Sequence, residues 1–592
     1  MKKTIRKVYD DKTRKGEFMK TKLKAGTVVA FVVWLLWLFV TYYITLPALN
    51  PHSTGFWLYL IIAVILPVAI FFALKTSDVK ISKKGFKIDS RMLHPVAKWL
   101  FIAIGIIIAI MIIGTISGAK LFHAKGYSSI LKTETYEFTE DIDQNSALSM
   151  IALMDTDSAI RLGNREIGSL TELVSQYDVS ENYSQIDYQG SPVKVSALDY
   201  AGFFKWMGNK NSGVPGYVSV DPVEQNADYI SLDEGMKYVP SAYFNSDLDR
   251  HIRFNFPTAI FGNTHFEIDE DGKPYYVASV YEYKIGLFGG ETVKGAIIVD
   301  PVSGDCNYYS VADVPTWVDF VFDGDLLTTQ YNWYGELGNG FWNSIFGKKG
   351  CKKCTETYNS EDESYAANYG YIAKDGDIWI YTGVTSVNED ASNIGFILVN
   401  QRTAEAHYYV IAGADENSAM SAAEGEVQEK GYDASFPSLI NVDGNLTYVM
   451  VLKDSSGIVK LYAMVNVEQY NKVTTASTIE ECYEKYERVL KRNTDSEDED
   501  SDDQNVDDTE LPSDDVEEEL GEEETLTIKI VSIQYVNIDG DTYVYIEGDD
   551  QKVYRQKFED NEMLITLREG DSITVNAQLS QRGIYYINSI AE

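Results

Sequence analysis

The chain has few of the residues that most often carry enzyme chemistry. Its 592 residues include only four cysteines and six histidines. No two histidines have the HExxH spacing of a zinc protease, and the chain has no GxSxG elbow or Walker loop. Four cysteines are too few for a disulfide scaffold, so the core must stabilise a body of this length. A hydrolase is an alternative hypothesis only, and its active site would consist of carboxylates that lie far apart in the sequence and converge in the fold.

Basic residues are scarce as well. The chain has 51 Lys and Arg against 89 Asp and Glu, a net charge of −38. The first 125 residues carry a net +14, which leaves −52 on the remainder. Because phosphate recognition needs basic faces, a body this acidic excludes nucleic acid as a partner.

Three long apolar runs lie near the start of the chain, at 27–49, 55–74 and 97–118. Each has roughly the 20 apolar residues that a bilayer core requires, and none has a charge in its middle. We therefore predict a three-helix membrane anchor over 27–121, with the lipid bilayer as its first partner.

The charges that flank these runs predict the orientation of the anchor. The first 24 residues hold ten Lys and Arg, whereas the loop between the first two runs has no charge. The positive-inside rule makes 1–26 a cytoplasmic basic segment. Three crossings then put the rest outside, beginning with a polar stalk over 122–156.

The exterior chain contains an internal repeat. The stretches 216–230, 295–309 and 395–409 align without a gap, and each has a glycine, then Val-Asp or Val-Asn, then a tyrosine thirteen residues after the glycine. A looser fourth copy lies at 461–473. A hairpin with a turn glycine precedes each copy, and helical stretches precede three of them. We expect about four helix–hairpin–hairpin units over 157–490.

The polar residue after the valine of each copy forms one set of candidate site residues. Taken alone, this residue suggests a catalytic or ligand carboxylate, but two of the four copies have asparagine. An amide forms the same turn hydrogen bonds as a carboxylate but is not a general base. We therefore interpret the set as structural turn residues, namely Asp221, Asp300, Asn400 and Asn466.

The stretch 299–305, Val-Asp-Pro-Val-Ser-Gly-Asp, resembles the strand–turn motif of PepSY-type domains. Such domains occur in secreted peptidase propeptides and in membrane-anchored bacterial envelope proteins. The resemblance implies PepSY-like units and a peptidase or an envelope-assembly protein as partner. The other copies depart from the motif, since the first has no turn glycine and the third has neither proline nor glycine.

Two further segments follow the repeats. Residues 493–525 contain eighteen acidic residues and no basic one, which predicts a disordered acidic linker. Residues 526–592 alternate apolar and polar residues over about five strands and resemble a small OB-like β-barrel. The fold class is thus a membrane-anchored α+β protein.

Cys351 and Cys354 form the one CxxC, in a loop rich in glycine and lysine. A local disulfide or a plain loop pair is the favoured interpretation, with a zinc site or a redox pair as alternatives. Short Asp-Gly turns could bind calcium, but none completes an EF-hand loop. We predict no cofactor, and the sequence does not exclude a bound calcium or zinc ion.

An aromatic cluster, "YNWYGELGNGFWNSIFG", spans 331–347. It predicts either a core between repeats, which we favour, or an exposed binding surface. The residues that would line such a surface are Trp333, Tyr334, Phe341 and Trp342.

These features predict a protein of the bacterial cytoplasmic membrane with its N-terminus inside and a large C-terminal body outside. The favoured function is non-catalytic: the body binds or scaffolds an envelope protein or a cell-wall partner. An extracytoplasmic ligand sensor is the second hypothesis.

Overall fold

The computed structural model divides the chain into two compact parts, Met1–Asp498 and Glu499–Glu592. It describes residues 28–76, 81–82, 85–86, 94–142, 154–222, 225–359, 364–387, 392–455, 457–494, 523–538, 541–550, 552–558, 561, 564, 567–568, 570–579 and 584–591. The predicted cytoplasmic segment 1–26 lies outside these residues, as does most of the acidic linker 493–525.

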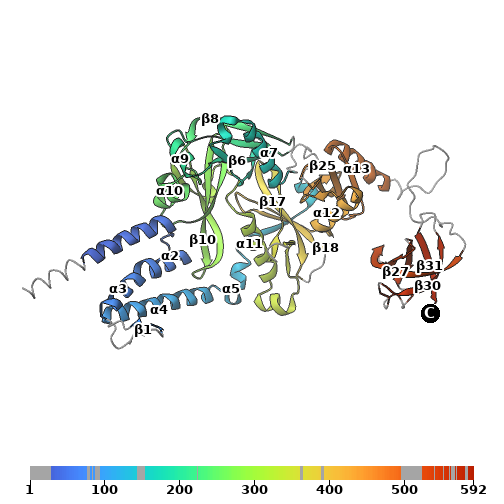
Figure 1. Ribbon diagram of the computed structural model, residues 1–592, viewed down its shortest axis with the longest axis horizontal. Coiled ribbons are helices and arrows are strands. Elements are labelled where there is room, and N and C mark those ends of the chain that lie inside the picture. The colour runs from blue at the N-terminus through green and yellow to red at the C-terminus, as the bar shows by residue number, and fades with distance from the viewer. Residues whose placement is uncertain are drawn as a thin grey trace, which may run out of the picture. The chain divides into compact units, whose positions relative to one another are not determined.

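Three helices near the N-terminus are long and apolar enough to cross a membrane, as predicted. They span Val28–Thr45, Thr54–Ala73 and Pro95–Ser117. The second consists of α2 (Thr54–Tyr59), a wider turn of π-helix (Leu60–Ile65) and α3 (Leu66–Thr76), and the third is α4. We call these three helices the anchor (Figure 1).

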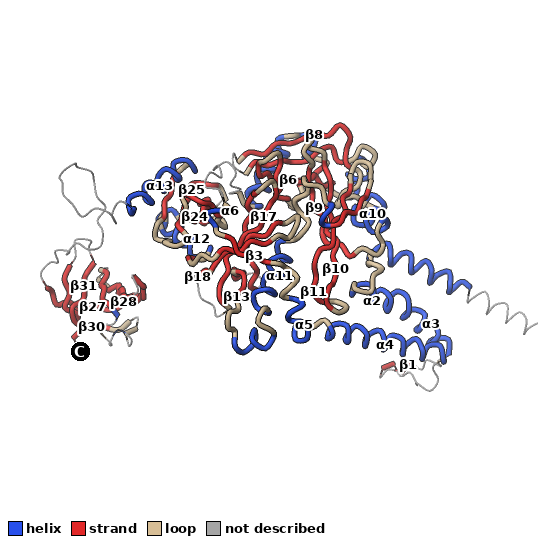
Figure 2. The backbone as a smooth tube through the Cα atoms, turned by 180° about the vertical axis from the view of Figure 1, so that it is seen from behind, coloured by secondary structure: helices blue, strands red, loops and turns tan. Residues whose placement is uncertain are grey.

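The body that follows contains four modules, each with a helix and an antiparallel sheet (Figures 1 and 2). Module 1 has α7 (Thr156–Ser169), α8 (Thr171–Val174), β4 (Tyr177–Val179), β5 (Ser184–Tyr188), β6 (Ser191–Tyr200), α9 (Phe203–Asn209), β7 (Val214–Asp221) and β8 (Asn226–Met236). Module 2 has α10 (Leu248–Asn255), β9 (Ile260–Ile268), β10 (Pro274–Ile285), β11 (Gly289–Val299) and β12 (Cys306–Ser310).

Modules 3 and 4 complete the body. Module 3 has α11 (Gly324–Leu337), a π-turn η6 (Asn343–Gly347), β13 (Lys352–Cys354), β16 (Gly370–Lys374), β17 (Asp377–Ser386), β19 (Gly395–Asn400) and β20 (Ala406–Tyr409). Module 4 has α12 (Glu416–Gly425), β22 (Asp433–Ala434), β23 (Ser438–Val442), β24 (Asn445–Lys453), β25 (Val459–Asn466) and β26 (Val473–Ala476). The short pairs β14–β15 (Glu356–Asn359, Ser364–Ala367) and β18–β21 (Ser392–Asn393, Gly413–Ala414) lie beside them.

The strand register is the same in all four modules. In each, the residue four positions after the hairpin glycine pairs with the valine that precedes the repeated Asp or Asn. The four pairs are Lys194–Val220, Tyr276–Val299, Ile380–Val399 and Tyr448–Val465. The number of residues between the two paired positions differs from module to module. The additional residues therefore lie in the connections between strands, and the pairing of the strands is the same in each sheet.

The glycine and tyrosine of the repeat meet across neighbouring strands. A Cβ added to Gly295 would lie 2.1 Å from the Tyr309 carbonyl oxygen and 2.8 Å from the Tyr308 hydroxyl oxygen. The Tyr308 ring thus covers a strand position that has room for no side chain. Its hydroxyl donates to the Lys294 carbonyl at 3.2 Å. The same arrangement holds for Gly216 with Tyr229 and for Gly395 with Tyr408.

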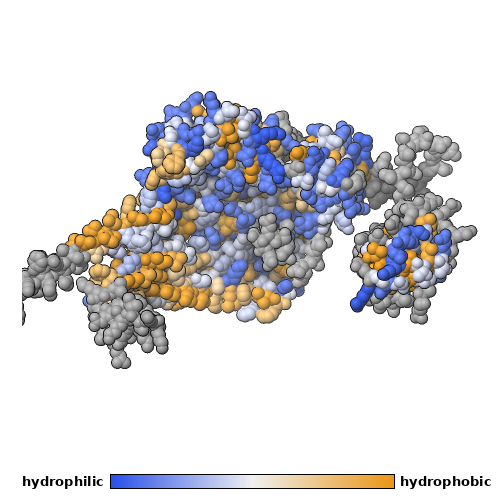
Figure 3. Space-filling model, viewed as in Figure 1, coloured by the Kyte–Doolittle hydropathy of each residue, from blue (hydrophilic) through white to orange (hydrophobic). Residues whose placement is uncertain are grey.

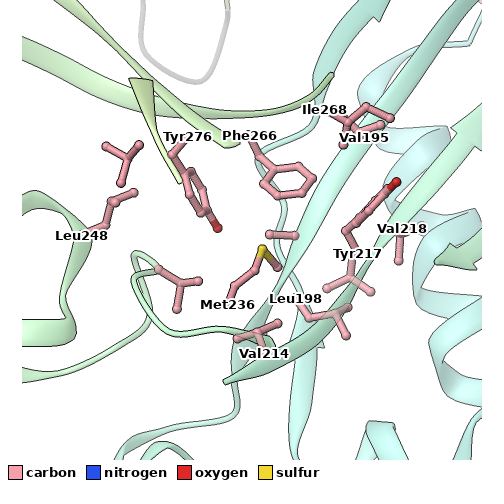
Figure 4. Close-up of a cluster of buried hydrophobic side chains, with 14 of the residues drawn as sticks. Val195, Leu198, Val214, Tyr217, Val218, Met236, Leu248, Phe266, Ile268 and Tyr276 are labelled. Atoms are coloured by element: carbon pink, nitrogen blue, oxygen red, sulfur yellow. The ribbon is translucent and has the colours of Figure 1, made fainter. Parts of the chain in front are cut away.

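The sheets of modules 2, 3 and 4 are buried on both faces. In β11, Ile297 and Val299 belong to a core shared with module 1, whereas Ala296 and Ile298 belong to a core shared with module 3. Figure 4 shows the first of these cores, which contains Leu248 and Tyr276 of module 2 together with Leu198 of module 1. Burial on both faces explains why these strands are continuous apolar runs with no alternation.

Helices contribute to each of these cores, and two of them were missed in the sequence. The first is α11, which contains the first part of the aromatic cluster, up to Leu337, and supplies the helix that module 3 lacked in the prediction. The second is α13 (Ile479–Thr494), whose Cys482, Tyr486 and Leu490 cover the outer face of the module 4 sheet. The stack thus ends in a helix that shields its last sheet from water.

The segment predicted as a stalk, 122–156, is partly built into the body. Helix α5 (Lys120–Tyr127) packs on α11, and β3 (Thr133–Tyr136) pairs in parallel with β20 of module 3. A short helix α6 (Phe138–Asp141) follows, and its Phe138 enters the core between modules 3 and 4. The polar composition of this segment hid a strand because β3 lies at a sheet edge, where its two middle residues, Glu134 and Thr135, are exposed to water.

The C-terminal part is a small closed barrel of five strands, in the order β27–β28–β29–β31–β30. The strands are β27 (Glu523–Ile538), β28 (Asp541–Gly548), β29 (Val553–Lys557), β30 (Ser572–Leu579) and β31 (Ile584–Ala591). Ile528, Val544, Tyr554 and Val575 fill its interior. The barrel begins three residues before the predicted boundary at 526.

The close contact of Gly295 predicts the cost of a single methyl group. We expect Gly295→Ala to lower the free energy of unfolding by about 1–3 kcal/mol, because the strands must separate to admit a Cβ. Urea unfolding in detergent, followed by tryptophan fluorescence, measures the change. Gly168→Ala is the matched control, since a Cβ there meets nothing within 4 Å. An equal effect of both substitutions would contradict this account of the repeat.

Candidate functional site

The repeated turn residues lie in separate modules and form hydrogen bonds within their own turns. One carboxylate oxygen of Asp300 accepts from the backbone N–H groups of Val302 at 2.8 Å and Ser303 at 3.1 Å. Its other oxygen pairs with the Lys273 ammonium at 2.8 Å. Burial acts to raise the pKa of Asp300, but these partners outweigh it and hold the pKa below its usual value. The carboxylate is thus ionised and fully engaged.

The asparagines make the same contacts without a charge. The Asn400 side-chain oxygen accepts from Arg402 N at 2.8 Å and Thr403 N at 2.9 Å, and that of Asn466 accepts from Gln469 N at 2.8 Å. In module 1 the Asp221 carbonyl accepts from Gln225 N at 3.0 Å. The structure therefore does not bring the four residues together in one site.

The two cysteines of the CxxC are separate, buried free thiols, which corresponds to the plain loop pair of the favoured interpretation and not to the local disulfide. Cys351 Sγ contacts the Glu336 carbonyl, whereas Cys354 Sγ faces the Thr328 carbonyl. Burial raises the pKa of both thiols, most strongly for Cys354. Within the described ranges, no three His, Cys, Asp or Glu side chains gather around a common point that would hold a metal ion.

The aromatic cluster is divided between a core and the surface. Trp333 is buried on α11, where its ring meets Tyr127 of α5 edge to face at 4.8 Å. Phe341 packs against the same small core, and Tyr334 packs at the margin of the core between modules 2 and 3. Trp342 alone of the four predicted residues is largely exposed. The cluster thus joins the body to the end of the anchor, because α5 directly follows α4.

The tip of the β10–β11 hairpin provides a second connection to the anchor. Gly114 and Gly118 form a GxxxG on α4, a spacing that suggests close packing of two helices. In this structure the glycines instead receive the hairpin. A Cβ on Gly114 would lie 2.7 Å from Leu287 Cδ2, and one on Gly118 would lie 3.1 Å from the Ile285 carbonyl oxygen. Because Gly114 and Gly118 have no side chains, the tip of the hairpin lies directly against α4.

The end of the first span provides a third connection. Arg250 of α10 donates from Nε to the Tyr43 carbonyl at 3.1 Å, and its guanidinium lies 4.3 Å from the centre of the Tyr43 ring. The Tyr43 hydroxyl donates to Asn245 at 3.0 Å. In the loop after this span, His52 Nδ1 lies 2.9 Å from the carbonyl oxygen of Leu287 on the hairpin. We call these three connections the anchor–body junction.

Buried carboxylates join the modules to one another. Asp319, in the segment between modules 2 and 3, accepts from Asp187 N of module 1 at 2.7 Å and from Ile378 N of module 3 at 3.0 Å. Glu267 of module 2 accepts from Asp319 N at 2.9 Å and from Phe320 N at 3.1 Å. Burial raises the pKa of Asp319 well above its ordinary value and that of Glu267 to about 7.

Glu416 has the same role between modules 3 and 4. It begins α12, and its carboxylate accepts from Gly383 N at 2.6 Å and from the Thr355 hydroxyl at 3.0 Å. Burial raises its pKa to about 7, although both donors favour the ionised form. Sequence reasoning missed all three acids. For two of them the available signal was an isolated acid between apolar residues, as in Phe266-Glu267-Ile268 and Val318-Asp319-Phe320. Glu416 lies between two polar residues and has no such signal.

One further cluster contains a histidine between two carboxylates. His407 Nδ1 lies 2.7 Å from Asp141 of α6, and its Nε2 lies 3.0 Å from Glu405. Tyr409 also hydrogen-bonds Asp141, and the Tyr136 ring stacks on the imidazole at 3.8 Å. Burial acts to raise the pKa of Asp141, but the hydrogen bonds from Tyr409 and His407 hold it below its usual value. With both imidazole nitrogens engaged, the cluster clamps the N-terminal strand β3 onto module 3.

Comparison with known proteins identifies no family. No family model and no curated protein matches the chain. Among solved structures, an exo-1,5-α-L-arabinanase from a bovine ruminal metagenomic library is 9% identical, with a TM-score of 0.15 over 70% of this chain and 100% of its own. A levansucrase mutant from B. megaterium is 10% identical, with a TM-score of 0.17 over 78% of this chain and 99% of its own. Similarities this low carry no argument about fold or activity.

Glu416 predicts a pH dependence of stability. Its ordinary pKa is 4.5 and its folded value is about 7, so between these values the folded state holds a proton that the unfolded state has lost. The contribution of Glu416 to stability is therefore full below pH 4.5 and is lost as the pH rises through 7. The loss is at most about 3 kcal/mol.

Glu416→Gln isolates this effect, because an amide can accept from Gly383 N and donate to the Thr355 hydroxyl. We expect the variant to match the native protein near pH 4.5 and to exceed it in unfolding free energy at pH 8, measured by urea unfolding in detergent. Glu426→Gln, at the exposed end of the same helix, should show no such difference. A constant difference across the pH range would contradict the assignment.

The contact between the hairpin tip and α4 predicts the effect of a larger side chain at Gly114. We expect Gly114→Val to displace the hairpin tip and to speed amide hydrogen exchange over 285–290 by at least about tenfold. Gly105→Val is the matched control on the same helix, since a Cβ there meets nothing within 4 Å. Equal exchange in the two variants would mean that the hairpin does not depend on the glycines.

Proposed function

We propose that this protein is a membrane-anchored, non-catalytic scaffold that binds a partner at the cell surface. The observation that carries the proposal is the way the body is fixed. Four modules share their cores in sequence, and three connections attach the resulting stack to the membrane helices. Such a body suits the display of a binding surface at a set position above the bilayer.

The charge of the chain indicates the chemistry of the partner. Residues after 125 carry a net −52. A surface of one sign steers partners of the opposite sign and repels anionic polymers. We therefore infer a partner with a basic face, an envelope protein in preference to an anionic wall polymer.

The location follows from the anchor and its flanking charges. The ten basic residues in the first 24 favour a cytoplasmic N-terminus in a bacterial membrane, with the body outside. The modules are PepSY-like in this proposal, which favours a peptidase or an envelope-assembly protein as the partner. The closed five-stranded barrel supports an OB-like assignment, and such barrels bind peptides or sugars as well as oligonucleotides.

A ligand sensor is the second candidate, and the β10–β11 hairpin favours it. This hairpin belongs to the module 2 sheet and ends on the glycine face of α4. A shift of the module 2 sheet would therefore move a membrane helix, provided that the two have discrete alternative arrangements.

Affinity capture of the full-length chain from cross-linked cell membranes tests the proposed function. We expect one protein in stoichiometric amount, with capture that weakens as salt is raised during cross-linking, because the contact is electrostatic. A membrane protein of similar size with a neutral exterior is the control. Capture of small molecules or wall fragments in place of a protein would favour the sensor. Substrate turnover abolished by a single Asp substitution would establish a hydrolase instead.

A further inference from the structure

Two patches of exposed aromatic side chains stand apart from the cores. The first aromatic patch lies on α9, on the loop before α10 and on α10 itself, and its members are Phe204, Met207, Tyr243, Phe244 and Phe254. The second aromatic patch lies on α5 and η6, and its members are Leu121, Phe122, Trp342, Ile345 and Phe346. Phe204 is 82% exposed and Phe346 is 78% exposed. Exposed groups of this kind mark interaction surfaces.

The first patch lies at the level where the first span ends. The rings on α9 and in the loop before α10 contact one another, and Phe203 and Trp206 of α9 pack against Phe244. Phe254 in turn lies 6.1 Å from the ring of Tyr43, near the end of the span. Tyr43 and Ile44 of the span also form a cavity of about 440 Å³ together with Tyr243 and Phe244 of the patch.

The second patch lies where the third span ends. Helix α5 begins three residues after α4, and its Leu121 and Phe122 face outward. The rings of Trp342 and Phe346 stack at 5.8 Å, and Phe341, the residue directly before Trp342, packs on the core that joins α5 and α11. Figure 3 shows the apolar surface of the spans continuing to this edge of the body.

We infer that both aromatic patches rest in the interfacial layer of the bilayer on the body side of the membrane. This inference rests on the proposed membrane anchoring and adds a second mode of attachment. The patches adjoin the ends of two different spans on the same side of the anchor, so a membrane surface that meets one span end passes close to both. Trp and Tyr, here Trp342 and Tyr243, favour this layer because it satisfies both an apolar ring and a polar group. The phenylalanines add apolar area of the kind that interfacial helices bury in the same layer.

The charges beside the patches agree with this occupant. Lys205 and Lys210 flank the first patch, and Lys348 and Lys349 flank the second. In a body with a large negative charge, these lysines lie where anionic headgroups would meet them, with their apolar stems along the bilayer. Because the spans already hold these surfaces beside the lipid, seating the rings costs little further entropy.

Photocross-linking of the full-length chain tests the inference. The probe is p-benzoyl-phenylalanine in place of Phe204 or of Phe346, in vesicles of phosphatidylcholine and phosphatidylglycerol, with adducts identified by mass spectrometry. Tyr470→p-benzoyl-phenylalanine is the matched control, since Tyr470 is 56% exposed on module 4. Ile113→p-benzoyl-phenylalanine, at a position on α4 that is 64% exposed, reports the anchoring separately.

We expect lipid adducts at 113, 204 and 346 at a level at least about tenfold above that at 470. If 113 forms adducts while either 204 or 346 stays at the level of 470, the inference is wrong and the anchoring stands. Cross-links from 204 or 346 to a second copy or to another protein would also overturn it. No adduct at 113 would overturn the anchoring and the inference together.

Discussion

The arrangement of the body depends on one buried carboxylate. Asp319 accepts backbone N–H groups from Asp187 in module 1 and from Ile378 in module 3, and its own N–H donates to Glu267 in module 2. Three modules therefore meet at a side chain that is 2% exposed. A buried acid without partners would be strongly destabilising, so each of these contacts is required for the others. Because each contact requires the others, the modules have one specific arrangement. Apolar packing alone is not directional and would allow one module to shift against the next.

That specificity also fixes how the body meets the three apolar helices. The β10–β11 hairpin belongs to the sheet that Glu267 and Asp319 hold in place, and its tip fills the space left by Gly114 and Gly118 on α4. Helix α11 of the next module reaches α5 through Trp333. The same packing that joins the modules thus sets the angle at which the body leaves the anchor.

Much of this could be predicted from local patterns. The three spans follow from apolar length, and the repeat from a glycine and a tyrosine thirteen residues apart, which the structure explains by a ring that covers a strand glycine. Helix α11 was missed because its apolar residues lie on more than one face, as its burial between modules 2 and 3 demands. Strand β3 was missed because pairing with β20, some 270 positions away, leaves no local signal.

The sequence by itself determined the three long apolar helices, the acidic charge and the hairpin turns, because each depends on neighbouring residues or on composition. Tertiary structure alone decided which acids are buried between modules, that the GxxxG receives a hairpin, and which half of the aromatic cluster faces water. The physical reason is that burial and partnership arise between segments far apart in the chain. An isolated Glu416 or Trp342 has the same chemistry in any sequence, and only its surroundings decide whether it joins two modules or meets the membrane.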